Sequence, residues 1–312
     1  MEPPSTPQPR VVALVLNYNG KEVTLDSIGS LLAMNYPNCD VVHIDNGSTD
    51  GSFDAVAEQF PDAIQVRTED NLWVAGGANL GMRWALERDY DYLMILNNDI
   101  EVEPEMLTEM VAVAESDPQV GCVGPKAYYY GDRDRIWSAG GLIRFREAGS
   151  KERGMGEMDR GQYDRTEEVE YINGCAVLMP RGVVEAVGGW DPNYRLALED
   201  TDWCLRMKTL GYHCMYAHKA ILWHRVSHTV GGYVAGRTYQ SGRSTAILVR
   251  RHGGLWQWLT FVAFMSAALP MAFVRELIKG NQAAVTAKLR GVVDGLRATL
   301  SEPPSFSSAS SS

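Results

Sequence analysis

The stretch Leu93–Glu101, L-M-I-L-N-N-D-I-E, constrains the fold more than any other part of this chain. Its apolar run is too short for a helix and fits a strand that is buried on both faces of a parallel sheet. Asn97, Asn98 and Asp99 then lie at the carboxyl end of that strand, where open α/β sheets bind ligands. The Asp99 carboxylate can there ligate a divalent cation that is shared with phosphate groups. The alternative is a simple turn, because Asn and Asp are common turn residues.

Earlier apolar runs repeat this arrangement of strand, polar loop and helically spaced apolar residues. They comprise residues 10–16, 40–44 and 63–66. The loop after the first run is Asn17–Gly20, and the loop after the second is the Gly- and Asp-rich segment Asp45–Ser52. Together with the run at residues 93–96, these units predict a doubly wound α/β sheet.

Two loops have the chemistry of a nucleotide pocket. Asp45 can accept hydrogen bonds from a base or ribose, and backbone N–H groups point outward where the following helix begins. An ordinary capped loop between strand and helix is the alternative. In the loop Asn71–Gly81, Gly76 and Gly77 allow a ligand to approach the backbone closely. This segment is neither a G-x-G-x-x-G fingerprint nor a P-loop, which needs a following Gly-Lys-Ser/Thr.

The rest of the sheet region is less regular. We expect a helix over Met106–Ala114, a short helix over Val183–Val187, and strands over residues 119–123, 171–179, 212–216 and 220–223. Residues 126–170 are rich in Tyr, Arg, Gly and Asp and show little periodicity. We expect a variable loop and hairpin region there, near the site and in contact with a second substrate. A partly disordered insertion is the alternative.

Further chemistry-bearing residues follow this region. Glu199, Asp200 and Asp202 come after a glycine turn and begin a helix. One of these acids can face a pocket, although acids in a first helical turn also stabilise the helix dipole. His224 ends the last strand and is either a metal ligand or a core histidine, and the residue alone favours the core.

The charge balance limits the classes of partner. A net charge of −10 and a pI of about 5.1 argue against nucleic-acid binding, which needs a basic surface. An acidic protein that handles an anionic ligand needs a local cation, which favours a metal. The five cysteines lack C-x-x-C spacing, so they indicate neither a disulfide framework nor a zinc cluster, and we expect a reducing compartment. The Pro-rich N-terminus lacks the apolar stretch of a signal peptide, so secretion by that route is not expected.

The C-terminal part has a different composition. Leu255–Val274 contains no charged residue, is long enough to cross a bilayer and is flanked by Arg and Lys. Polar residues and a proline interrupt it, and the next segment places the apolar residues of 285–296 on one helical face. We expect a tail that lies on or dips into the cytoplasmic leaflet. A single span and a soluble docking helix are the alternatives.

Taken together, the motifs form an ordered set. In chain order they are V-L-N-Y-N-G, H-I-D-N-G-S-T-D-G-S, N-L-W-V-A-G-G-A-N-L-G, L-N-N-D, N-G-C-A-V-L-M, G-G-W-D, L-E-D-T-D-W-C-L-R and W-H. Over roughly residues 10–230 this set resembles glycosyltransferase family 2, and it is similar to the rhamnosyltransferase-type branch of bacterial cell-envelope glycan assembly. The resemblance implies a glycosyltransferase-A fold with a mixed, mainly parallel sheet, a nucleotide-sugar donor, a divalent metal (Mg²⁺ or Mn²⁺) and inversion at the anomeric carbon.

The resemblance also implies roles for individual residues. Asn97-Asn98-Asp99 stands where the family has its D-x-D motif, so Asp99 becomes the main carboxylate on the metal, which His224 also approaches. Glu199-Asp200 matches the acidic pair that supplies the catalytic base, with the second acid favoured. The residues expected to bind the nucleotide sugar are Asn17, Tyr18, Asp45, Asn71, Gly76, Gly77, Asn79, Asn97 and Asn98.

The expected organisation has four regions. Residues 1–9 form a disordered N-terminus, and residues 10–235 form a catalytic domain with a nucleotide-sugar half (10–125) and an acceptor half (126–235). Residues 236–300 form a helical, membrane-associated region, and residues 301–312 form a disordered tail rich in serine.

The expected function is transfer of one sugar, rhamnose or another deoxysugar, to a hydroxyl of a cell-envelope glycan or lipid-linked acceptor at the inner face of the membrane. Gln240–Ser244 lacks the tryptophan of the Q-x-x-R-W motif of processive synthases, which favours single-sugar transfer. The alternatives are a nucleotidyltransferase of similar topology and a nucleotide-sugar or glycan-binding protein without turnover. The N-Y-N-G loop argues against the first, and the Glu199-Asp200 pair argues against the second.

Overall fold

The computed structural model describes residues 8–145, 149–226 and 235–306. Of the ends expected to be disordered, 1–9 and 301–312, residues 1–7 and 307–312 lie outside the described residues. Residues 301–306 are described and contact the sheet domain through Ser301 and Pro304. Residues 146–148 and 227–234 of the expected acceptor half also lie outside them.

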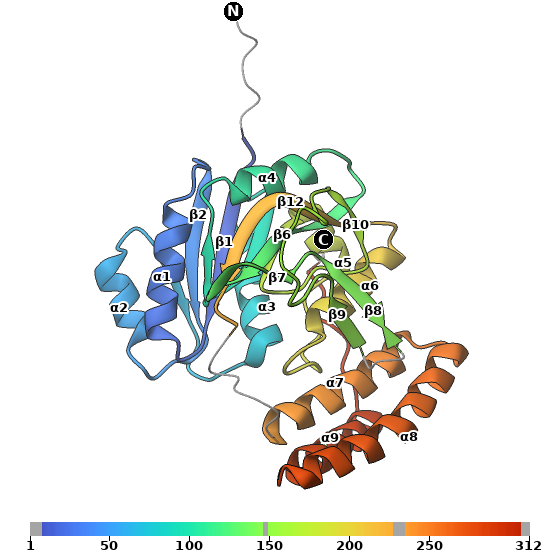
Figure 1. Ribbon diagram of the computed structural model, residues 1–312. Coiled ribbons are helices and arrows are strands. Elements are labelled where there is room, and N and C mark those ends of the chain that lie inside the picture. The colour runs from blue at the N-terminus through green and yellow to red at the C-terminus, as the bar shows by residue number, and fades with distance from the viewer. Residues whose placement is uncertain (1–7, 146–148, 227–234, 307–312) are drawn as a thin grey trace, which may run out of the picture.

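The centre of the molecule is a ten-stranded mixed sheet in the order β10-β12-β6-β11-β4-β1-β2-β3, with β5 and β7 paired to β12 and β6 (Figure 1). β4, β1, β2 and β3 are parallel, whereas β11 runs antiparallel between β4 and β6. The expected mixed α/β sheet is therefore confirmed; β12 is also parallel to β6. The strands are β1 (Val11–Asn17), β2 (Cys39–Asp45), β3 (Ile64–Arg67), β4 (Tyr92–Asn97), β5 (Ile100–Val102), β6 (Val120–Tyr129), β7 (Asp132–Ser138), β10 (Glu167–Val169), β11 (Ala176–Pro180) and β12 (His213–His224).

Helices cover both faces of the sheet. One face carries α1 (Lys21–Leu32), α2 (Ser52–Gln59) and α4 (Met106–Ala114), and the other carries α3 (Trp73–Leu86), α5 (Arg181–Val187) and α6 (Glu199–Thr209). Alternate residues of β1 enter two separate cores, because Val11 and Ala13 pack on the first face while Val12 and Leu14 pack on the second. A strand buried on both faces requires an uninterrupted apolar run, which is the pattern that the sequence shows.

Some expected strand boundaries are wrong. β11 begins at Ala176, so the preceding residues of the expected strand 171–179 form a loop instead. The strands expected at 212–216 and 220–223 are one strand, β12, whose register against β6 shifts between Ala217 and Ile221. A single apolar run with an irregular middle cannot be distinguished from two strands by its spacing alone.

The hairpins expected within residues 126–170 are present, since β6 pairs with β7 and β8 (Gly141–Arg144) pairs with β9 (Gly149–Glu152). Polar contacts hold this region in place. Buried Lys126 forms an ion pair with Asp159 at 2.9 Å and a second with Asp164. A buried ammonium group must be paired, so these contacts fix a segment that has little apolar periodicity of its own.

The C-terminal region forms a separate helical layer of α7 (Ala235–His252), α8 (Leu255–Ile278) and α9 (Gln282–Arg297), below the sheet in Figure 1. α7 and α9 approach closely at glycines: a Cβ at Gly291 would lie 2.0 Å from the Tyr239 carbonyl oxygen, and one at Gly242 would lie 2.4 Å from that of Lys288. The chain then returns to the sheet domain, where the Gly189 N–H donates to the Pro304 carbonyl at 2.8 Å. Only α8, among the described helices, is long and apolar enough to cross a membrane.

The fold also brings together thiols that the sequence spacing does not connect. Cys122 of β6, Cys204 of α6 and Cys214 of β12 are buried, with their Sγ atoms within 4.8 Å of one another. All five cysteines are free thiols, and these three pack among the apolar side chains on the α3 and α6 face of the sheet.

Candidate active site

The polar ends of three parallel strands meet at one edge of the sheet. In β1 and β2, Asn17 is opposite Asp45, and in β1 and β4, Leu16 is opposite Asn97. The loops that follow these strands therefore lie side by side, as expected for the ligand-binding edge of an α/β sheet.

Asp99 and His224 are brought together across this edge. β5 follows directly after Asp99 and pairs antiparallel with the end of β12, with Ile100 opposite His224. The His224 Nε2 atom lies 3.0 Å from Asp99 Oδ1, and the two side chains are only 8% and 10% exposed. The Trp137 ring meets the imidazole edge-on at a centroid distance of 4.4 Å. Residues 125 positions apart thus form one buried pair.

The geometry of this pair suits a divalent cation. Two adjacent ligands of an octahedral ion, each about 2.1 Å from the metal, are about 3.0 Å apart, which matches the observed separation. One carboxylate oxygen and one imidazole nitrogen are both suitable ligands. The His224 Nδ1 atom is buried and has no hydrogen-bond partner in the described part of the chain.

The Asn17 side chain is buried and forms contacts within the protein. Its amide donates to Ser52 Oγ at 2.8 Å, and its carbonyl oxygen accepts from the Gly20 N–H at 3.1 Å and from Asn98 Nδ2 at 2.8 Å. These contacts use the side chains of Asn17 and Asn98 to join the loop after β1 to the turn that carries Asp99. Neighbouring Tyr18, in contrast, is 48% exposed.

Asp45 is fully buried at the end of β2. Its Oδ2 atom lies 3.0 Å from Arg67 Nε, and Arg67 also donates to the Ser48 carbonyl at 3.0 Å. The Ser48 hydroxyl in turn accepts from the Asn19 N–H at 2.9 Å. The expected nucleotide loop therefore has a fixed conformation with an oriented carboxylate.

The glycine-rich segment packs closely against the rest of the protein. A Cβ at Gly77 would lie 2.4 Å from Leu16 Cδ1, and one at Gly76 would lie 2.6 Å from Leu72 Cβ, so the chain itself occupies the space beside both glycines. These glycines allow α3 to pack on the sheet, rather than leaving room for a ligand. Asn71 Oδ1 accepts from the Trp73 N–H at 2.7 Å and holds the turn before α3.

The Asn79 side chain is fully used within the protein. Its Nδ2 donates to the Trp190 carbonyl and its Oδ1 accepts from the Trp190 N–H, both at 2.8 Å. This buried amide therefore holds the G-G-W-D turn against α3, and the contact of Asn79 with the donor stays a prediction.

Glu199 and Asp200 begin α6 after two residues with left-handed backbone, Ala197 (φ 68°) and Leu198 (φ 72°). Such strained residues are commonly found at functional sites. Asp200 Oδ2 accepts from the Gly174 N–H at 2.8 Å and Oδ1 accepts from the Thr201 N–H at 2.6 Å. The Glu199 Oε2 atom is buried and has no hydrogen-bond partner among residues 8–145, 149–226 and 235–306.

Burial separates the protonation states of these two acids. It raises the pKa of Asp200 to about 6. Burial, and then the negative charge of Asp200, raises the pKa of Glu199 to about 8. At neutral pH the Asp200 carboxylate is therefore ionised and Glu199 is protonated.

A third acid, the half-buried Glu152 of β9, carries no signal in the sequence. It accepts hydrogen bonds from Tyr171, Ser138 and, at 2.9 Å, Asn173 Nδ2. Burial raises its pKa, and the negative charge of Asp200 acts in the same direction. A single glutamate in the segment K-E-R gives no sequence signal, because its position depends on the β8–β9 ribbon.

Comparison with known proteins identifies the family and the fold. Residues 7–249 match the model of the family described as glycosyltransferase like family 2. The chain belongs to this family.

Curated relatives include the poly-β-1,6-N-acetyl-D-glucosamine synthases of Staphylococcus aureus (26% identical over 242 residues, 77% of this chain and 56% of that protein) and Staphylococcus epidermidis (23% identical over 239 residues, 76% and 55%). The chain thus spans about 56% of the length of the first of these relatives.

Solved structures confirm the glycosyltransferase-A fold. The mannosyltransferase PcManGT of Pyrobaculum calidifontis, in complex with GDP-Man and Mn²⁺, aligns with a TM-score of 0.59 at 18% identity, over 93% of this chain and 88% of that one. GalNAc-T7, with UDP, GalNAc and Mn²⁺, aligns with a TM-score of 0.61 at 13% identity, over 86% and 58%.

The candidate site of this family 2 protein opens into a pocket of about 340 Å³ beside His224. Its walls include Tyr130, Arg135 and Arg225. The Arg225 guanidinium lies 3.9 Å from the centroid of the Tyr130 ring, and the Arg225 N–H donates to the Asp99 carbonyl at 2.8 Å. The pocket is therefore adjacent to the Asp99–His224 pair and has aromatic and cationic groups in its wall.

Proposed function

We propose that this chain is an inverting, metal-dependent glycosyltransferase that moves one sugar from a nucleotide-diphosphate donor to a hydroxyl of a cell-envelope glycan or lipid-linked acceptor. One observation carries the proposal: the dipeptide Gly174-Cys175 connects the candidate metal ligands to the candidate base. The Gly174 N–H binds Asp200, and the Cys175 carbonyl accepts from the Asn97 N–H at 3.0 Å, two residues before Asp99.

For the donor, we assign the nucleotide to the loops after β1 and β2. Tyr18 offers a half-exposed ring that can stack on a base. Asp45 is buried behind Arg67, so we propose that the nucleotide displaces the exposed Arg67 side chain and donates a hydrogen bond to Asp45 from its base or ribose. Asn97 lies at the end of β4, beside the diphosphate position. A thymidine-diphosphate deoxysugar such as rhamnose is the proposed donor, on the similarity of the sequence motifs to the rhamnosyltransferase-type branch.

Asp99 and His224 are the proposed metal ligands. A bound Mg²⁺ or Mn²⁺ supplies positive charge that stabilises a diphosphate leaving group. The protein contributes a buried, preorganised ligand pair whose orientation is fixed by Trp137 and by the pairing of β5 with β12.

Asp200 is the proposed base. It is the ionised member of the acidic pair at neutral pH, and the backbone N–H groups of Gly174 and Thr201 fix its orientation. In the reaction, the acceptor oxygen forms the new bond to the anomeric carbon from the face opposite the leaving group, and its proton passes to Asp200. Protonated Glu199 can donate a hydrogen bond but cannot take this proton.

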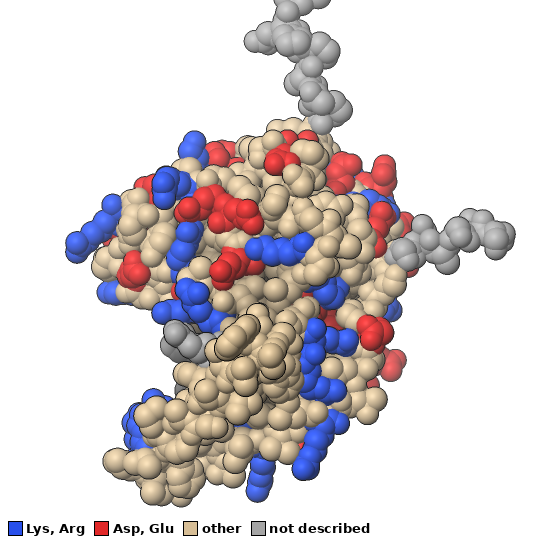
Figure 2. Space-filling model, turned by 90° about the vertical axis from the view of Figure 1, so that its right-hand side faces the viewer, with Lys and Arg blue, Asp and Glu red and all other residues tan. Residues whose placement is uncertain are grey.

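We further propose that α8 contacts the inner face of the cytoplasmic membrane. One side of the helix packs through Phe261 and Met265 on α7 and α9. Trp256 and Ile278 are 75% and 83% exposed, so a second side is open. Lys and Arg side chains border the uncharged surface of the helical layer in Figure 2. An apolar face with a basic border suits an anionic leaflet, where the helix would lie along the surface.

The proposed single-sugar transfer rests on the sequence of α7. Gln240–Ser244 lies within this helix, where Gly242 packs against α9 and Arg243 donates to the Asn193 carbonyl at 2.5 Å. The segment therefore joins helices and lacks the tryptophan of the processive motif.

The decisive experiment is a screen for release of nucleoside diphosphate. Full-length protein would be mixed with nucleotide sugars of different bases and with glycan and lipid-linked acceptors, with and without Mn²⁺. Release that requires both metal and acceptor supports the proposal. Donor binding without release in the presence of any acceptor would instead indicate a binding protein. In a parallel mixture of nucleoside triphosphates and sugar 1-phosphates, release of pyrophosphate would indicate a nucleotidyltransferase.

A further inference from the structure

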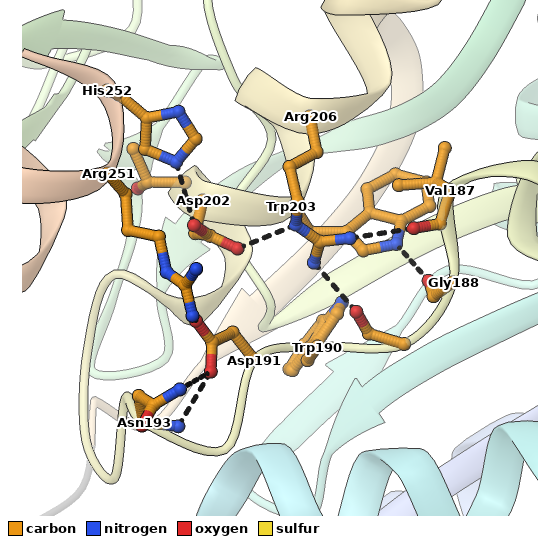
Figure 3. A network of polar contacts seen from close by, with 12 residues as sticks. Val187, Gly188, Trp190, Asp191, Asn193, Asp202, Trp203, Arg206, Arg251 and His252 are labelled. Carbon is orange, nitrogen blue, oxygen red and sulfur yellow. Dashed lines mark hydrogen bonds and ion pairs between the residues drawn. The ribbon is translucent and has the colours of Figure 1, made fainter. Parts of the chain in front are cut away.

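The last turn of α7 ends in three consecutive basic residues with different partners. Arg250 stays within the helical layer, where it donates to the carbonyls of Gly295 and Ala298, both at 2.8 Å. Arg251 and His252 instead reach the sheet domain (Figure 3). This division separates residues that hold the layer together from residues that join it to the catalytic part.

His252 contacts the helix that carries the acidic pair. Its Nε2 atom lies 2.7 Å from Asp202 Oδ1, and Asp202 is fully buried in the first turn of α6, two residues after Asp200. The other oxygen of Asp202 lies 2.9 Å from Arg206 Nε. Burial alone would raise the pKa of Asp202, but His252 and Arg206 together hold it below its usual value. Asp202 is therefore an ionised, buried carboxylate that depends on both partners.

Arg251 contacts the neighbouring turn. Its guanidinium lies 2.9 Å from Oδ2 of Asp191, which is fully buried in the G-G-W-D turn, and Asp191 Oδ1 accepts from the Asn193 N–H at 2.8 Å. Figure 3 shows both basic side chains entering from α7, with the Asp191 turn and the Asp202 helix on one side of them. Arg206 links these two elements, because it also donates to the Gly189 carbonyl at 2.7 Å.

The G-G-W-D turn, which contains Asp191, is separated from the candidate base Asp200 only by Gly174. A Cβ added to Gly174 would lie 2.8 Å from the ring of Trp190 and 3.7 Å from Asp200 Oδ2. Gly174 therefore fits between Trp190 and the carboxylate that its own N–H binds. A shift of the turn or of the first turn of α6 would move Asp200 relative to the acceptor.

We propose that Arg251 and His252 are positioning residues for Asp200, so that the C-terminal helical layer is part of the catalytic apparatus as well as a docking surface. This inference rests on the proposed function, in which Asp200 is the base. At the end of α7, Arg251 pairs with buried Asp191 and His252 pairs with buried Asp202. The position of α7 therefore fixes the G-G-W-D turn and the first turn of α6, the two elements that hold Asp200.

The test compares three single-residue variants of the full-length chain. His252→Ala and Arg251→Ala should each lower kcat by about 10- to 100-fold with donor KM unchanged, because small displacements of a reacting group have effects of this order. Arg250→Ala is the matched control, since it removes a neighbouring charge that contacts only the helical layer, and it should retain kcat within about two-fold. His252→Gln keeps a side-chain N–H for Asp202 and should recover most of the lost rate.

Wild-type kcat in folded His252→Ala and Arg251→Ala would overturn the inference, as would an equal loss in Arg250→Ala. If the alanine variants do not fold, amide hydrogen exchange of Arg251→Lys decides. Arg251→Lys keeps the positive charge, so the variant should fold. Its amide hydrogens at residues 189–193 and 200–204 should exchange faster than those of Arg250→Ala. Unchanged exchange there contradicts the inference. If wild-type protein transfers no sugar at all, the proposed function fails, whereas the exchange comparison still reports on the contact.

Discussion

At the scale of single residues, the proposed metal ligands Asp99 and His224 form a buried pair. Asp99 supplies the carboxylate of the N-N-D sequence, and His224 lies 3.0 Å from it. Two ligands are few for a tight metal site, so the donor's phosphates would have to complete the coordination. Metal and donor should therefore bind together.

The first prediction concerns Asp99. Asp99→Ala should abolish turnover and metal-dependent donor binding and leave the fold intact, because it removes the carboxylate ligand. Calorimetry of nucleoside diphosphate binding with and without Mn²⁺ measures this. Asp54→Asn, in exposed α2, is the control and should behave as wild type. Wild-type turnover in Asp99→Ala would remove Asp99 from the metal site.

The second prediction separates the two acids of α6. Asp200→Asn should keep donor and metal binding but lose about 10²-fold or more in turnover, as expected when a general base is removed. Glu199→Gln should lose less, because Glu199 is already protonated at neutral pH. Transfer rates at saturating donor and acceptor would test this. A larger loss in Glu199→Gln would exchange the two roles.

The third prediction follows from the raised pKa of Glu199. Its ordinary value is 4.5 and its folded value is about 8, so between these values the folded state holds a proton that the unfolded state has lost. The resulting stabilisation is complete below 4.5 and disappears as the pH rises through 8. Glu199→Gln does not titrate. The Tm of Glu199→Gln should exceed that of wild type by the largest margin at alkaline pH. If the two proteins instead give parallel curves of Tm against pH, Glu199 has an ordinary pKa and the prediction is wrong.

At the scale of elements, the sequence predicts those parts whose stability is local. The four early strands and the helix Met106–Ala114 follow from uninterrupted apolar runs and helical spacing, and they agree with the structure to within a few residues. The sequence likewise marks Asp99, His224 and the acidic pair as candidates, because each directly follows or begins a strongly patterned element. A local sequence pattern is enough to predict a residue's place in the fold when a single strand or helix determines that place.

The missed features depend on partners far away in sequence. β7, β9 and β10 have little apolar pattern, and Lys126 is paired with acids more than thirty residues later. The contacts of Asn79 with Trp190 and of His252 with Asp202 join residues 111 and 50 positions apart. No periodicity in the sequence marks such pairs. The contact of Asn79 with Trp190 and the position of Glu152 can therefore be recognised only in the structure.

The fourth prediction concerns the packing of α7 on α9. Gly291→Ala would place a Cβ 2.0 Å from the Tyr239 carbonyl oxygen and should destabilise the protein by about 1–3 kcal/mol through overpacking. Gly236→Ala is the control, since Gly236 lies in α7, the helix that carries Tyr239, and nothing lies within 4 Å of its Cβ position. Denaturant unfolding measures both. Equal stability of the two variants would contradict the close contact between these helices.

At the scale of the whole molecule, the catalytic sheet and the helical layer present two unlike surfaces. Acidic side chains are prominent over the sheet domain in Figure 2, whereas the lower layer shows an uncharged surface bordered by basic residues. Against an anionic membrane, this distribution would attract the helical layer and repel the sheet domain. The active site would then face an acceptor held at the membrane surface.

The last prediction tests this orientation through α8. Trp256 and Ile278 are its most exposed large apolar residues, and transfer of each side chain out of water contributes about 1.5–3 kcal/mol. Replacing both with Ser should therefore weaken binding to vesicles of anionic phospholipid by about 10-fold or more, as measured by flotation. Leu210→Ser is the matched control, because Leu210 is 53% exposed but follows α6 in the sheet domain. If wild type does not float with the vesicles, or if Leu210→Ser weakens binding equally, α8 is not the membrane-facing element. Loss confined to the α8 variant would show that this helix holds the catalytic domain at the membrane.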